Sequence, residues 1–95
     1  MAVPGSNWTA TISWVNSGEA GVDTEVFFGG PYGSPPASGT LPSVGAAGVG
    51  KSSLTITMGT SPTMGTYYTQ VAHTKAGYSM SALSPVTPLG VDSLP

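Results

Sequence analysis

The residues most typical of a chemical site form a glycine-rich run in the middle of the chain. Residues 45–52, GAAGVGKS, match the pattern G-x-x-x-x-G-K-[ST] of phosphate-binding loops. Such a loop binds phosphate when a strand leads into it and the N-terminus of a helix receives the phosphate. Here Pro42 breaks the preceding segment, and residues 52–59 alternate in polarity as a strand does. We therefore expect no nucleotide site, and no effect of Lys51→Ala on stability or function.

The other ionisable groups give no catalytic arrangement. His73 is the only imidazole, and Lys75 lies two residues after it. A catalytic base needs an oriented nucleophile and, in most cases, a carboxylate that orients the base. Asp23 and Glu25 share a strand face, but nothing in the sequence brings them to His73. The sequence therefore predicts a protein that is not an enzyme and has no catalytic residues, no metal site and no cofactor.

Composition narrows the class of partner. Only 6% of the 95 residues are charged, against about 25% in an ordinary soluble domain, and two lysines without arginine cannot neutralise a run of phosphates. No apolar run approaches the ~18 residues of a membrane helix. The start, MAVPGSNWTATIS, lacks the basic and apolar regions of a signal peptide, so Asn7-Trp-Thr9 is expected to be a strand start and not a glycan acceptor. We expect no nucleic acid, no membrane, and a surface of Ser, Thr, Gly and Asn.

Short strands separated by Gly and Pro are the main structural signal. Trp8, Ala10, Ile12 and Trp14 alternate with hydroxyl residues and predict a half-buried strand. Further strands are expected over residues 24–28, 53–58, 66–74 and 78–86, with a short edge strand near 41–44 and a tight turn at 75–77. We expect Trp14 to point inward, so that Trp14→Ala costs about 3–5 kcal/mol.

The second half of the chain resembles immunoglobulin-like domains. The segments SLTI (53–56), GTYY (65–68), VA (71–72) and AGYS (76–79) resemble strands E, F and G of that family, and Trp14 resembles the tryptophan of fibronectin type III domains. The resemblance implies an all-β fold, an immunoglobulin-like antiparallel β-sandwich of about seven strands over residues 1–87. Thr69 or Gln70 stands where the second cysteine would be, so no disulfide joins the sheets. Residues 88–95 are expected to be an extended, Pro-containing tail.

Adjacent aromatic residues suggest a contact surface. One residue of each pair Phe27–Phe28 and Tyr67–Tyr68 must face outward, and we expect Phe27, Tyr67 and Val71 to line the outer face of one sheet. The surface could be ordinary exposed apolar area, a partner-protein contact or a sugar platform. We also expect the tail to be mobile after Thr87 and to dock on a partner, so that deleting residues 88–95 leaves the melting temperature unchanged. The candidate contact residues are Phe27, Tyr32, Tyr67, Val71, Leu89, Val91 and Leu94.

The resemblance also suggests a setting. Short free immunoglobulin-like domains resemble the virion proteins of tailed bacteriophages, notably the small proteins that decorate capsids. This implies a virion accessory protein made in the host cytoplasm, with a capsid or tail protein of the same particle as partner and self-association left open. The alternative is a carbohydrate-binding or adhesive module of a larger secreted protein.

Overall fold

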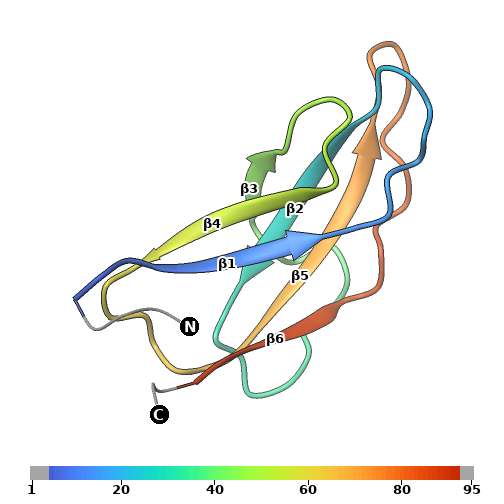
Figure 1. The fold of residues 1–95 in the computed structure, drawn as a ribbon. Helices are drawn as coiled ribbons and strands as arrows, with labels where there is room; N and C mark the ends of the chain where they lie inside the picture. The colour runs from blue at the N-terminus through green and yellow to red at the C-terminus, as the bar shows by residue number, and fades with distance from the viewer. Residues whose placement is uncertain (1–4, 93–95) are drawn as a thin grey trace.

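Two antiparallel sheets and no helix make up the computed structural model, which describes residues 5–92 (Figure 1). The strands are β1 (Trp8–Ser13), β2 (Asp23–Gly29), β3 (Ser43–Ala46), β4 (Ser53–Gly59), β5 (Gly65–Thr74) and β6 (Thr87–Val91). One sheet has two strands, β1-β4, and the other has four, in the order β3-β2-β5-β6. The prediction of an all-β fold is confirmed.

The core lies between the two sheets, which cross each other in Figure 1. On β1, Ala10 and Ile12 are buried, and Leu54, Ile56 and Met58 of β4 pack beside them. Val26 and Phe28 of β2 face them from the larger sheet. The Phe28 ring stacks on Tyr67 of β5 with 5.4 Å between the ring centroids. The period-2 alternation of β1 and β4 therefore placed their inward faces correctly.

Trp14 contributes to this core from its margin. It follows the last residue of β1, packs against the core and is half-buried. Its indole Nε1 donates a hydrogen bond of 3.1 Å to the carbonyl of Lys51. The inward orientation matches the prediction, but a half-buried side chain loses less apolar area on truncation than a fully buried one. We therefore lower the expected cost of Trp14→Ala to about 2–3 kcal/mol.

The prediction of about seven strands in an immunoglobulin-like topology is wrong. Residues 5–92 form six strands, only two of them in the smaller sheet, and residues 78–86 form no strand. That segment nevertheless runs along the edge of β5. Ser84 Oγ accepts the Val71 N–H at 2.8 Å and Ser81 Oγ accepts the His73 N–H at 2.9 Å. Serine hydroxyls thus replace main-chain carbonyls as partners of β5, and the ladder becomes irregular.

The segment expected to be a tail after Thr87 is a paired strand as far as Val91. Residues 87–91 are β6, which pairs with β5 from Thr87↔Thr69 to Val91↔Gly65, and Val91 is buried. Proline is compatible with a strand at the edge of a sheet, where its missing N–H costs no ladder bond. Pro88 occupies such an edge. Leu94 lies outside the described residues.

The outer face of the larger sheet is covered by the loop that follows β2. Gln70 of β5 is 1% exposed and its amide is fully used by the covering segments. Its Nε2 donates to Ser38 Oγ (2.9 Å) and to the Ser84 carbonyl (2.8 Å), and its Oε1 accepts the Gly39 N–H (3.1 Å). The long Gly- and Pro-rich loop is therefore packed against the sheet by specific polar contacts.

Candidate functional site

The glycine-rich run connects two strands. Its first residues end β3 and residue 53 begins β4, so a strand stands where a phosphate-binding loop has its helix. Its amides are also already bonded. The Gly48 N–H donates to Asp23 Oδ1 at 2.8 Å and the Gly50 N–H donates to the Val22 carbonyl at 3.0 Å. A carboxylate of the protein itself thus takes an amide that a phosphate would need, and Lys51 is exposed.

His73 faces a hydroxyl. Its Nδ1 lies 3.0 Å from Thr24 Oγ1, and the two residues are cross-strand partners in the β2–β5 ladder. Neighbouring residues in a strand point to opposite faces. Asp23 and Glu25, on either side of Thr24, therefore point to the other face of the sheet. The two carboxylates of β2 are not brought to the imidazole.

The candidate contact residues do not form one surface. Tyr67 is in the core, and Val71, opposite Val26, packs against it, so the expectation that both line an outer face is wrong. Phe27, opposite Gln70, does face outward and is half-buried. Tyr32 is exposed in the covering loop, with its ring centroid 6.2 Å from that of Tyr68. In an aromatic pair, the sequence does not show which residue points inward until the register is known.

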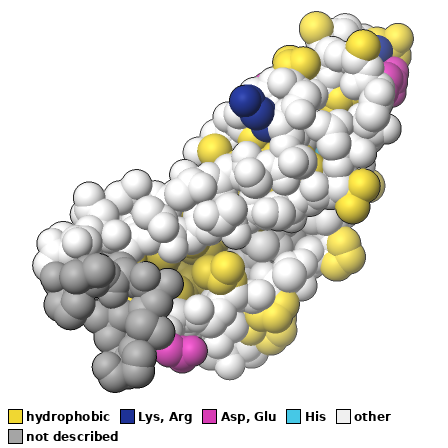
Figure 2. Space-filling view, in the orientation of Figure 1, with side chains coloured by type: hydrophobic (Ala, Val, Ile, Leu, Met, Phe, Trp, Pro, Cys, Tyr) yellow, Lys and Arg dark blue, Asp and Glu magenta, His cyan; other side chains and the backbone are white. Residues whose placement is uncertain are grey.

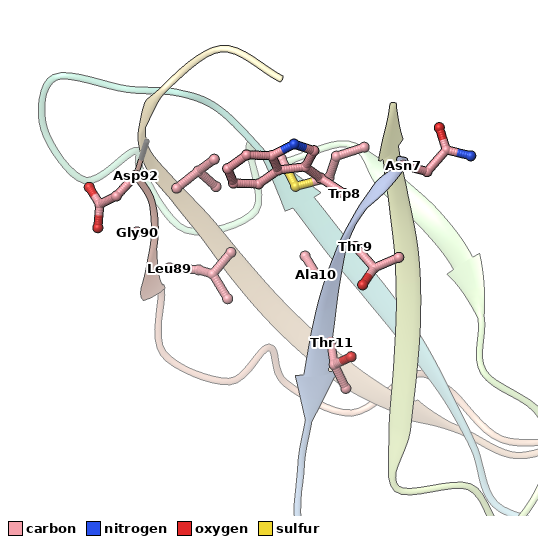
Figure 3. Close-up of a pocket in the computed structure, with 10 residues that line it drawn as sticks. Asn7, Trp8, Thr9, Ala10, Thr11, Leu89, Gly90 and Asp92 are labelled. Atoms are coloured by element: carbon pink, nitrogen blue, oxygen red, sulfur yellow. The ribbon is translucent and has the colours of Figure 1, made fainter. Parts of the chain in front are cut away.

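Leu89 and Val91 lie inward too, but at the margin of the core, where a groove opens between β1 and β6 (Figure 3). We call this the β1–β6 groove. In the close-up, Trp8 reaches from β1 toward β6, Leu89 points toward it, and Asp92 lies at the rim. The groove has a volume of about 410 Å³, and its lining residues are Asn7, Trp8, Thr9, Ala10, Thr11, Met58, Leu89, Gly90, Val91 and Asp92.

The groove is visible at the surface as a hollow. Figure 2 shows hydrophobic side chains gathered in it beside an acidic side chain, on a face that is otherwise mostly uncharged. Trp8, Met58 and Leu89 are all half-buried, so part of each apolar side chain is accessible. Trp8 was assigned to the inner face of a strand, but its place at the open margin depends on the order of strands in the sheets, which the sequence does not show.

A second, smaller pocket lies at the end of the molecule where β5 ends. We call it the Tyr78 pocket; it has a volume of about 220 Å³ and is lined by Glu19, Val22, His73, Thr74, Lys75, Tyr78, Ser79 and Ser81. Tyr78 is 72% exposed. Lys75 Nζ lies 5.3 Å from the centroid of the Tyr78 ring and 2.9 Å from Glu19 Oε1. The pocket combines an exposed aromatic ring with donors and acceptors.

No protein-family model, curated protein or solved structure matches the chain. Within residues 5–92, no helix is long and apolar enough to cross a membrane. The same residues contain no group of three or more His, Asp or Glu side chains placed to hold a metal ion. The site must therefore be interpreted from its own geometry.

Proposed function

We propose that this protein is a non-enzymatic binding module, and that it acts as an accessory protein of a bacteriophage virion, such as a capsid decoration protein. The observation that carries the proposal is the β1–β6 groove, a hollow in which the apolar side chains of Trp8, Met58 and Leu89 meet polar ones, along the margin of a sandwich with few charged residues. Apolar hollows with a polar surround mark sites of protein association. A surface with few charges also suits a protein that is packed against others.

Local structure in the second half supports the sequence resemblance behind this proposal. The Tyr67 hydroxyl donates a hydrogen bond of 2.9 Å to the carbonyl of Thr63, four residues earlier at the turn into β5. Immunoglobulin-like domains make such a bond at their tyrosine corner. The similarity is confined to this turn and does not extend to the topology of the sheets.

Co-sedimentation with particles assembled without the protein tests the proposal. We expect the full chain to bind capsids or tails in a saturable manner, and the same chain unfolded by heat and kept in denaturant to serve as the negative control. Binding should resist moderate salt, because salt screens contacts between charges and Asp92 is the only charged side chain among the described residues that line the groove. Failure to sediment with either capsids or tails would overturn the virion assignment.

The Tyr78 pocket favours one second candidate, a carbohydrate-binding module. An exposed aromatic face suits the apolar face of a sugar ring, and Glu19, His73 and Lys75 supply polar groups around it. Binding of the full chain to an array of glycans would test this candidate. Tyr78→Ala should then abolish binding, whereas Tyr32→Ala, at an exposed ring outside the pocket, should not. Equal loss in both variants would argue against the pocket.

A further inference from the structure

The two sheets differ in width, and the difference creates the groove. A two-stranded sheet cannot cover a four-stranded one, and the groove lies between β1 and β6, the last strand of the larger sheet (Figure 1). Neighbouring strands in a sheet lie about 4.8 Å apart. One strand added beside β1 would therefore lie over β6 in the β1–β6 groove, into which Trp8 and Leu89 reach in Figure 3.

The free edge of β1 offers hydrogen bonds to such a strand. The Trp14 N–H donates to the Ser52 carbonyl at 2.9 Å, which directs the main chain of Trp14 toward β4. Main-chain groups of successive residues in an antiparallel ladder point to alternate sides. Thr9, Thr11 and Ser13 therefore direct their N–H and C=O groups away from β4. Within residues 5–92, no strand pairs with that edge.

Side chains do little to protect this edge between Thr9 and Ser13. Many native edges carry Lys, Pro or other charged side chains, whereas the exposed side chains of β1 over this stretch are all hydroxyls, and the one register shift of the β1–β4 ladder lies before it, at Trp8/Thr9. β6 differs. The Val71 carbonyl accepts the Ser84 N–H, so the main chain of Val71, and by alternation along β5 that of Tyr67, points toward the β6 side. Leu89, opposite Tyr67, is therefore in a hydrogen-bonded pair, and the main-chain groups of Pro88 and Gly90 point to the free edge. Because Pro88 has no N–H to donate at that edge, we expect an added strand to pair with β1 and not with β6.

We propose that the β1–β6 groove receives one extended segment of the partner protein, which adds to the free edge of β1 as a strand. The inference rests on the proposed function and specifies how the partner binds. Main-chain bonds would supply affinity, and apolar side chains at alternate positions would fill the space beside Trp8 and Leu89. Asp92, the one charged side chain among the described lining residues, favours a segment with a Lys or Arg at that end.

A second copy of this domain does not fit as the occupant. If two copies paired through β1 around a two-fold axis, the β6 strand of each would lie under the strand that the other adds, and the two β6 strands would compete for the same space. A single segment has no second sheet and avoids this conflict. The geometry therefore selects an extended arm over a paired domain.

Amide hydrogen exchange, followed by NMR on the full chain, tests the proposal without a mutation. The probe is a capped peptide of alternating Val and Thr residues ending in Lys, and the control has Pro in place of alternate Thr, which removes N–H groups that would face β1. We expect the first peptide to slow exchange of Thr9, Thr11 and Ser13 by about tenfold, about 1.4 kcal/mol. The control should not slow it.

Other outcomes of this experiment would overturn the proposal. Equal slowing at Ser53 and Thr55, on the β4 strand, would show binding without preference for the groove. Slow exchange at Thr9 and Thr11 in the protein alone would show that the edge is already occupied. A dimer in sedimentation velocity, with these amides protected, would assign the edge to a second copy.

Two matched substitutions extend the test to particles. Thr11→Pro removes an N–H at the free edge of β1, and Thr55→Pro alters the residue opposite it on β4. We expect the first to weaken particle binding at least tenfold and the second to leave it unchanged. If Thr11→Pro does not fold, the exchange experiment decides. If the unsubstituted chain sediments with particles while Thr9 and Thr11 exchange at their free rate, the proposed function stands and strand addition fails.

Discussion

At the scale of single residues, Gln70 has a role in the structure that differs from the one for which the sequence drew attention to it. It was noted as a possible replacement for the second cysteine of an immunoglobulin domain. In the structure it points away from the inter-sheet core and fixes the covering loop to the outer face. Period-2 alternation predicts that neighbours in β5 face opposite ways, but only the cross-strand register, Gln70↔Phe27, shows which way each points.

We predict that Gln70→Leu destabilises the protein by about 1–3 kcal/mol, because it removes at once the hydrogen bonds that the buried Gln70 amide makes to Ser38, Gly39 and Ser84. Ser38→Ala is the matched control. It removes one acceptor at an exposed residue, where water can replace it, and should cost less than about 1 kcal/mol. Urea denaturation of the three proteins measures both values. Similar losses in the two variants would contradict this account of Gln70.

At the scale of elements, the sequence pattern located most strands well and the segment after β5 poorly. β1, β2, β4 and β5 were predicted near their observed bounds, because β1 and β4 alternate in polarity and β2 and β5 are rich in Thr, Val and aromatic residues, which favour strands. The segment 78–86 alternates too, but its serines bond to β5 through their side chains, so it is not a strand. Residues 87–91 were assigned to a tail because of Pro88. Composition alone does not show that a proline faces the open side of an edge strand.

The loop that follows β2 leads to a second prediction. At Gly30, φ is +146°, and a Cβ would lie 2.8 Å from the Tyr67 Cα. Both the backbone conformation and the contact with main-chain atoms oppose any side chain there. Gly30→Ala should cost about 2–3 kcal/mol and lower the melting temperature by about 10 °C or more. Gly33→Ala is the control, because Gly33 lies in the same loop with open space around it, and it should have little effect. Calorimetry measures both melting temperatures. Equal shifts in the two variants would show that the loop is loosely packed and would contradict this prediction.

At the scale of the whole molecule, the candidate site could not be predicted from the sequence. The β1–β6 groove exists because one sheet is two strands narrower than the other, and that difference follows from which strands pair. Leu89 and Val91 were identified as contact residues, but in a free tail. In the structure they form the floor of the groove, so the same residues contribute both to the core and to the proposed site.

The last prediction concerns this double role of β6. Removing residues 87–95 would delete the β5–β6 ladder and uncover the core where Val91, 5% exposed, now lies. We expect a loss of about 3–4 kcal/mol and a melting temperature lower by about 15 °C or more, the opposite of what a free tail would give. Pro88→Ala is the control, since Pro88 faces the open edge and its ladder bonds are not involved; it should melt within about 3 °C of the full chain. If the truncated chain melts like the full one, β6 is not held against the core, and the groove then has no floor on which a partner strand could pack.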